Sequence, residues 1–285
     1  MIRSDRLSDL PDHLLQHILS FLPTQEAIAT SLLSKRWTSL WTGSPTLHFD
    51  ALNFCSSIFF VEFVEHALIF FRNSNHVRIF RLRFGSFGLQ PDHNIINWIA
   101  TVINKLKVEE LDLSFTSYWF SVHMCSGILN SSAMRVLKLN GVTVSTDYSV
   151  NLPSLEALHL ERVIFPEFRC LVMLLTGCPR LEELKLSLFV IFATTKAIKI
   201  ESLQHLVSSK PSFLVRLKRF CFDQFKASET QYRVARFIMD NAKALKTVSI
   251  ICRSSVNSLP NNAKKLSTCP RGSEDYGGLL LYSNF

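Results

Sequence analysis

The sequence predicts an α/β chain in which a unit of three helices precedes a solenoid of short strands that alternate with helices or loops. Three observations predict this fold. In the first fifty residues, apolar side chains recur at helical spacing between prolines. Further along, the pattern Leu-x-x-Leu-x-Leu recurs six times with conservative substitutions. The composition, 47% hydrophobic and 19% charged, is typical of a folded chain with a sizeable core.

The first helix is expected to begin at Pro11, because the missing N–H of proline would have no partner in a first turn. Asp12 beside it complements the positive end of the helix dipole. Pro23 forbids continuation of this helix. Between the prolines lies a wide apolar stripe made by Leu14, Leu15, Ile18, Leu19 and Leu22.

Two more helices are expected in this unit. Thr24 is predicted to cap the second through its side chain, and Ser34 the third, which would end near Gly43. Three helices in some forty residues bury little apolar surface, so such a unit needs a metal, a disulfide or a partner. Because no cysteine or metal-ligand set precedes Cys55, we expect a partner.

The order of these residues resembles the F-box in its plant form. The matching runs are DRLSDLPD at 5–12, ILSFLPT at 18–24, ATS at 29–31, LSKRW at 33–37, then Leu40, Trp41 and Leu47. We therefore place an F-box at residues 1–50. The resemblance implies docking onto the Skp-type linker subunit of a cullin–RING ubiquitin ligase.

Carried over by position, the resemblance also implies which residues face or support that linker subunit. They are Leu10, Pro11, Ile18, Leu22, Pro23, Ile28, Lys35, Trp37 and Trp41. The alternative, that several of them only fill the small core of the unit, stays open at this point.

Residues 51–75 are expected to form a linking and capping helix. Their apolar residues fall at helical spacing: Phe60, Phe63, Val64, Ala67, Leu68 and Phe71. Since a solenoid would expose core at its end, this helix is expected to cover the first repeat.

Residues 76–225 are predicted to be leucine-rich repeats. The central anchors of six copies are Leu111, Leu137, Leu158, Leu184, Phe220 and Val248, spaced 26, 21, 26, 36 and 28 residues apart. All but the fourth spacing lie in the range of about 20 to 29 residues for leucine-rich repeats. The 36-residue step suggests lost repeats. Each copy is too short to bury its own apolar face, so neighbouring copies must stack.

Within each copy the alternation predicts a half-buried strand with its leucines inward and polar residues outward. The outward residues form our candidate surface for target recognition, against the alternative that most are simply solvated. Its members are Asp112, Lys138, His159, Glu161, Lys185 and Asp223.

The repeats lack the asparagine or cysteine that many leucine-rich repeats place three residues after the last leucine. Val142 and Val163 stand there instead and extend the apolar pattern, which resembles the irregular repeats of plant F-box proteins. In residues 226–285, the run LSTCPRGS at 266–273 resembles the FBD module that closes many of these proteins. Beyond it, residues 279–285 are expected to be irregular, as in a truncated or diverging copy.

Several functional classes lack support. No phosphate-binding glycine loop or nucleophile elbow occurs, and His13 and His17 have Leu14 in place of the glutamate of a zinc helix. We therefore expect no cofactor, no metal and no catalysis. No secretory signal or membrane-spanning stretch is visible.

The net charge of +8 raises a rival hypothesis of nucleic-acid binding. Basic residues gather at Arg78, Arg81 and Arg83, at Arg216, Lys218 and Arg219, and at Lys264, Lys265 and Arg271. Acidic repeats separate them, so a solvated face or an acidic protein partner is favoured. Seven scattered cysteines without a C-x-x-C pair fit a reduced intracellular compartment, nucleus or cytoplasm.

The resemblance thus implies a non-catalytic adaptor of an SCF-type ubiquitin ligase. Its F-box would dock onto the Skp-type linker, and through it onto the cullin and RING subunits, while its repeats bind an unknown target protein. The alternative is a stand-alone leucine-rich-repeat scaffold for proteins or nucleic acid that carries a vestigial F-box.

Overall fold

The computed structural model describes residues 7, 9–71, 77–85, 93–116, 122–123, 128–144, 149–187, 191–192, 212–226, 228–253, 266 and 279–284. The chain divides into two compact units, Met1–Ser117 and Tyr118–Phe285. The α/β class expected from the sequence is confirmed, with helices at the start of the first unit and parallel strands in both units.

The first unit begins with a small helical head. Its elements are α1 (Asp12–Leu19), α2 (Thr24–Ala29), the 3-10 turn η1 (Thr30–Leu32), α3 (Trp37–Leu40) and the 3-10 turn η2 (Trp41–Gly43). Extended prolines, Pro11 and Pro23, precede α1 and α2. The core of the head consists of Leu15, Leu19, Ala27, Trp37 and Leu40. So few residues make a small core, as the length of the head predicts.

Two predicted helix caps are wrong. The Thr24 side chain makes no capping bond to α2, since its hydroxyl instead accepts a hydrogen bond of 2.8 Å from the backbone N–H of His48. Ser34 does not cap α3, which begins after Arg36 without a side-chain cap. A hydroxyl at a helix start usually accepts from the helix itself, but that of Thr24 accepts from His48, 24 residues further along the chain.

A parallel three-stranded sheet completes the first unit. Its strands, in the order β1-β2-β3, are β1 (Thr46–Asp50), β2 (Ile79–Phe84) and β3 (Glu110–Phe115). Between them lie η3 (Ala51–Asn53), α4 (Ser57–Phe71), α5 (His93–Thr101) and a π-helical turn, η4 (Val102–Leu106). The inward residues Leu47, Phe80 and Leu111 stand in one register row and are buried.

Helix α4 covers one face of this sheet. Its buried side chains lie against aromatic residues of the strands and of α5, with the Phe60 ring centroid 5.8 Å from that of Phe84 and 6.2 Å from that of Trp98. The end of the sheet at β1 is covered differently, because the hydrogen bond from His48 to Thr24 joins β1 to α2. The head and the helix therefore share the task of covering the first strands.

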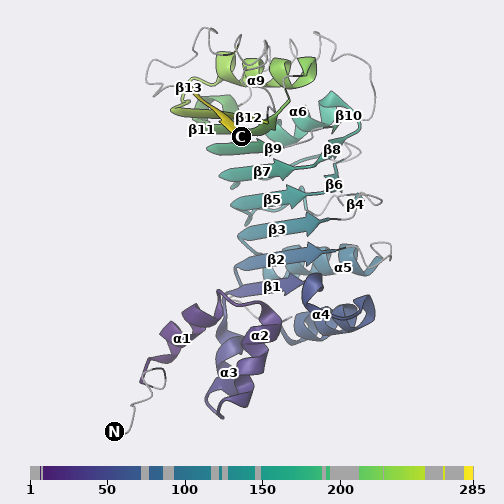
Figure 1. Ribbon diagram of the computed structural model, residues 1–285, viewed down its shortest axis with the longest axis vertical. Coiled ribbons are helices and arrows are strands. Elements are labelled where there is room, and N and C mark those ends of the chain that lie inside the picture. The colour runs from purple at the N-terminus through teal and green to yellow at the C-terminus, as the bar shows by residue number, and fades with distance from the viewer. Residues whose placement is uncertain are drawn as a thin grey trace. The chain divides into compact units, whose positions relative to one another are not determined.

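The second unit is a stack of parallel strands (Figure 1). In spatial order they are β5 (Val136–Asn140), β7 (Ala157–Glu161), β9 (Glu183–Ser187), β11 (Arg219–Phe225), β12 (Thr247–Arg253) and β13 (Leu279–Asn284). The predicted anchors Leu137, Leu158, Leu184, Phe220 and Val248 are register partners from strand to strand, and all are buried. The repeat prediction is confirmed.

Across the 36-residue step β9 and β11 pair directly, with Leu184 opposite Phe220, as their places as successive anchors predict. One expectation for this unit is wrong. Residues 279–285 were expected to be irregular, but Leu279–Asn284 is a strand parallel to β12. Its run of leucines lacks the alternation of a half-buried strand, so its sequence alone does not predict it.

A second, short parallel sheet lies where other leucine-rich repeats carry asparagine. Its strands are β4 (Val122–His123), β6 (Val142–Thr143), β8 (Ile164–Phe165) and β10 (Ile191–Phe192). Val142, Val163 and Phe165 are buried, so apolar packing takes the place of the asparagine side chains, as their spacing predicts. The described helices of this unit are α6 (Phe168–Thr176), α8 (Phe213–Arg216) and α9 (Glu229–Asn241).

Several strands of the second unit begin or end in the same way. Strands β7, β9, β11 and β12 each start with two successive N–H groups that donate to one carbonyl of the preceding repeat; Glu156 and Ala157, for example, both donate to Arg135 O, at 2.8 and 3.1 Å. Directly after the third outward residue the chain turns through a left-handed conformation, at Gly141 (φ 71°), Arg162 (φ 48°) and Gln224 (φ 52°). These shared ends hold the outward residues in rows.

Candidate protein-docking surfaces

The head presents the predicted linker-facing residues at three levels of exposure. Trp37 is buried in its core, so its role is to support the surface. Leu10, Leu22 and Trp41 pack against that core and are half-buried, as are Pro23 and Ile28. Pro11, Ile18 and Lys35 are exposed. Of the nine residues, one therefore fills the core, five are half-buried and three are exposed.

Arg36 holds the start of α1 in place. Its Nε and Nη2 donate to Asp12 Oδ1 at 2.9 and 2.6 Å, and Nη2 also donates to the carbonyl of Leu10. The guanidinium thereby joins the residues before α3 to the segment that carries Pro11. This contact positions an exposed proline, and neither the spacing nor the prolines predicted it.

Sequence reasoning missed the most exposed apolar side chains of the head. Phe21, Leu32 and Leu33 are 72, 91 and 68% exposed, and Leu14 shares the exposed face of α1 with Ile18, at 41% each. For α1 the sequence did contain a sign of this exposure, because its apolar stripe is too wide for so small a core. When Leu15 and Leu19 of the stripe are buried, Leu14 and Ile18 beside them remain exposed.

Exposed large apolar residues concentrate in the first unit. Of the 13 found among the described residues, 12 lie in Met1–Ser117 and one, Val215, in the second unit. Single exposed leucines are ordinary, but exposed apolar residues that gather in one part of a chain are typical of proteins that bind a partner there.

The predicted target-binding residues are held in register rows on the outward side of the strands. Asp112 belongs to the first unit. In the second unit Lys138, His159 and Lys185 stand in one row, where adjacent strands lie about 4.8 Å apart. Glu161 and Asp223 stand in the next row with Ser187 between them, and the Ser187 hydroxyl donates to Asp223 Oδ2 at 3.3 Å.

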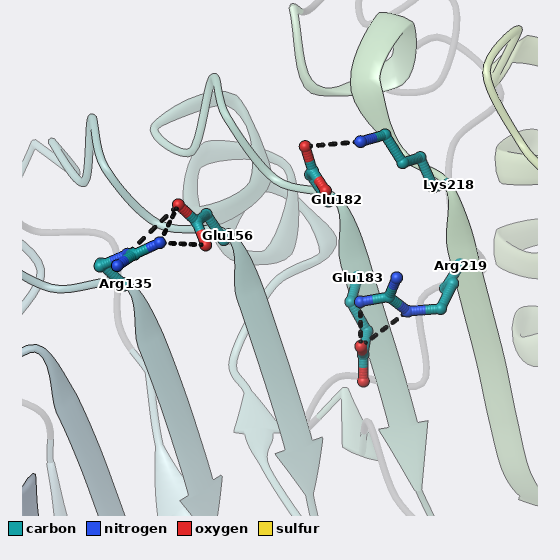
Figure 2. A network of polar contacts seen from close by, with 6 residues as sticks. All are labelled: Arg135, Glu156, Glu182, Glu183, Lys218 and Arg219. Carbon is teal, nitrogen blue, oxygen red and sulfur yellow. Dashed lines mark hydrogen bonds and ion pairs between the residues drawn. The ribbon is translucent and has the colours of Figure 1, made fainter.

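The outward charges form ion pairs from one repeat to the next (Figure 2). Arg135 contacts both carboxylate oxygens of Glu156, at 2.9 and 3.0 Å, and Lys218 Nζ donates to Glu182 Oε1 at 2.8 Å. The Lys218 hydrogen bond holds the pKa of Glu182 below its usual value. These pairs lie at the entry to the strands, beside the shared carbonyls.

Glu183 is the most connected carboxylate of this surface. Arg219 donates to its Oε2 at 2.9 and 2.7 Å, and His159 Nε2 lies 2.8 Å from its Oε1. Burial raises the pKa of Glu183, but the hydrogen bonds from Arg219 and His159 outweigh it, so the pKa lies below its usual value. Glu183 thus joins three neighbouring strands, β7, β9 and β11, through one side chain.

The same pairing neutralises several of the basic residues that suggested nucleic-acid binding. Arg81 pairs with Glu110 and Arg83 with Asp50, each at 3.3 Å, while Lys218 and Arg219 pair with glutamates. A cation already paired with a carboxylate is a poor phosphate ligand. Lys264, Lys265 and Arg271 lie outside the described residues.

Among the described residues, no three His, Cys, Asp or Glu side chains are grouped as metal ligands.

Cys178 is buried, its Sγ donates to Leu174 O at 3.1 Å, and burial raises its pKa to about 12. Burial also raises the pKa of Cys221 and Cys252. None of these three thiols is a ready nucleophile at neutral pH. No described helix has the length and apolarity needed to cross a bilayer.

Comparison with known proteins matches both parts of this arrangement. The F-box domain model matches residues 7–49, and the model of the LRR repeats of FBD-associated F-box protein At5g56370 matches residues 95–257. The latter match runs past residue 225, where the predicted repeats end, and includes β12.

Curated proteins of Arabidopsis thaliana are similar over most of this chain. F-box/FBD/LRR-repeat protein At5g22700 is 33% identical over 201 residues, which cover 70% of this chain and 45% of that protein. FBD-associated F-box protein At1g66310 is 35% identical over 64% of this chain and 41% of its own length. The chain spans less than half the length of these relatives.

Proposed function

Because this chain belongs to the family of FBD-associated F-box proteins with leucine-rich repeats, we propose that it is a non-catalytic adaptor of an SCF-type cullin–RING ubiquitin ligase. In this proposal the helical head docks onto a Skp-type linker subunit, which connects it to the cullin and RING subunits. The repeats hold a target protein. The adaptor then acts by raising the local concentration of the target and by orienting it.

The observation that carries the proposal is the apolar surface of the head. A core of five residues leaves Leu14, Ile18, Phe21, Leu32 and Leu33 in water. Covering them with a partner removes apolar area worth about 25 cal/mol per Å². A standard interface buries about 1,600 Å² in total, and loss of one central anchor costs about 2 kcal/mol or more.

The outward rows of the repeats support the second half of the proposal. Part of this surface is held by ion pairs across strands, those of His159 and Arg219 with Glu183, which limits the side-chain entropy lost there when a target binds. We propose Asp112, Lys138, His159, Glu161, Lys185 and Asp223 as target contacts. The pairing of Arg81, Arg83, Lys218 and Arg219 with carboxylates gives the nucleic-acid alternative no support.

A binding measurement with a purified Skp-type linker subunit tests docking. Ile18→Asp combined with Leu32→Asp places charges on the apolar surface while leaving the core of the head intact, and it is expected to lower affinity at least thirtyfold. Val215→Asp is the matched control, since Val215 is 62% exposed but lies in the second unit. Equal affinity of the wild type, the double variant and Val215→Asp for the linker subunit would refute the docking proposal.

A further inference from the structure

Helix α4 has a second face that the sheet does not cover. Ile58 and Phe59 near its start, and Ile69 and Phe70 near its end, are 64, 58, 69 and 58% exposed. The pairs are eleven residues apart, or about three turns, so they lie on the same side of the helix. Exposed Glu62, Glu65 and His66 lie between them. The face therefore carries two separate apolar ends.

The two ends differ in what lies beside them. The Phe70 ring lies against Trp41 of the head, with centroids 5.0 Å apart and planes inclined by 36°, and Phe71 meets the same indole at 5.7 Å. Trp41 itself is half-buried against the head's core. The end of α4 at Ile69 and Phe70 is thus continuous with the head, whereas Ile58 and Phe59 are about 16 Å away along the helix.

We propose that the Skp-type linker subunit covers this end of α4 as well as the head, so that its binding site extends beyond the F-box onto Ile69 and Phe70. The inference rests on the proposed function. Trp41 is a proposed linker contact and the exposed ring of Phe70 lies against it, so a partner that contacts the exposed part of Trp41 is expected to reach Phe70 as well. Two large apolar side chains then leave water, and the exposed carboxylates of Glu62 and Glu65 mark the border of the contact.

The same helix supplies matched controls. Ile69→Gln is paired with Ile58→Gln, because both isoleucines are exposed to a similar degree, 69 and 64%. Glutamine is a good helix former, so the helix is retained. Phe70→Gln is paired with Phe59→Gln, since both rings are 58% exposed. Phe70→Gln also removes the packing of Phe70 on Trp41, so a change in its affinity combines lost binding with lost packing inside the chain. The affinities of the isoleucine pair do not depend on that packing.

Affinity for the purified linker subunit is measured by calorimetry on the full chain, with the thermal midpoint recorded for each variant. Ile69→Gln and Phe70→Gln are expected to weaken binding about tenfold, and Ile58→Gln and Phe59→Gln less than twofold. Unchanged affinity of Ile69→Gln overturns the inference, as does equal weakening by Ile58→Gln. If Ile69→Gln and the head variant Ile18→Asp/Leu32→Asp both bind the linker subunit normally, the proposed function is wrong as well as the inference. If Ile69→Gln binds normally but the head variant does not, the head still docks onto the linker subunit and only the contact with α4 is refuted.

Discussion

The hydroxyl of Thr24 accepts a hydrogen bond of 2.8 Å from the backbone N–H of His48, and this bond joins helix α2 to strand β1. Both groups lie in the first unit, and Thr24 is 4% exposed. A strand at the end of a sheet leaves N–H groups without strand partners. In this chain the helical head supplies an acceptor for one of them, so the head also serves as an end cover for the sheet.

Replacing Thr24 tests this connection. Thr24→Val keeps the shape of the side chain but leaves the His48 N–H without its acceptor, which is expected to lower the free energy of unfolding by about 1–3 kcal/mol. Urea unfolding measures the change. Thr38→Val is the control, because the exposed Thr38 hydroxyl makes only a 3.5 Å contact, with the carbonyl of Ser34. Equal stability of the two variants would contradict the connecting role.

Gly177 is predicted to tolerate no side chain. A Cβ at this position would lie 2.6 Å from the carbonyl oxygen of Val150, a backbone atom that cannot rotate away. Gly177→Ala should therefore cost about 1–3 kcal/mol in thermal or urea unfolding. At Gly85 the nearest atom, at 3.1 Å, belongs to the exposed side chain of Leu52, so Gly85→Ala should cost less than about 1 kcal/mol. If Gly85→Ala were the more destabilising of the two, the backbone at Val150 would have to move aside to accommodate the added Cβ.

The left-handed turn after β5 predicts a different ranking of substitutions. Gly141 has φ 71°, where a Cβ is crowded against the backbone. Gly141→Ala is expected to lower stability by about 1–2 kcal/mol, and Gly141→Asn by less, because asparagine tolerates this conformation. The urea midpoints of both variants check this ranking. If side-chain size rather than φ determined the loss of stability, Gly141→Asn would be less stable than Gly141→Ala.

The ion pairs of Glu183 predict a pH effect. Its pKa in the folded chain lies below the usual value of 4.5, so its contribution to stability is present above about pH 4.5 and is lost as the pH falls through the folded pKa. Glu183→Gln should therefore unfold more easily at pH 7 and show a flatter decline of stability in acid. Glu167→Gln serves as control, since Glu167 is exposed and its contact with Arg169 is 3.6 Å long. Acid slopes identical in wild type and Glu183→Gln would contradict this assignment.

Thiol labelling should separate the cysteines by burial. Cys55 is exposed and is expected to react with iodoacetamide within minutes at pH 8, whereas buried Cys178, with its pKa raised to about 12, should react only as the chain opens. Peptide mass spectrometry resolves the two sites. Addition of urea should bring the rate at Cys178 close to that at Cys55, and rapid labelling of Cys178 in the native protein would contradict its placement.

The repeats could be predicted because their information is local. Leucine at every second position sets the face that each strand buries, and the recurring anchors at Leu137, Leu158 and Leu184 predict which residues pair. The same order of anchors predicts that β9 pairs with β11, although 36 residues separate Leu184 from Phe220, because a longer loop costs little more to close. Strand β13 could not be predicted, since its run of leucines does not alternate with polar residues.

The proposed docking surface of the head could be predicted only in part. Helical spacing identified the apolar residues around Ile18 and Trp37, but not that Ile18 is exposed and Trp37 buried. A wide stripe has several ways to face a small core, and contacts with other segments select among them. Phe70 shows the same limit, because nothing near it in sequence indicates that its ring lies against Trp41.

Taken by itself, the sequence determined the family and most of the helices and strands: proline and leucine spacing act over a few residues, and backbone geometry converts them directly into local structure. Tertiary structure alone decided which charges pair across strands, which apolar residues stay outside, and that Thr24 serves a strand rather than its own helix. Those outcomes depend on groups 21 to 36 residues apart, as with Arg135 and Glu156 or Glu183 and Arg219, whose distance is set by sheet register and packing and not by local preference.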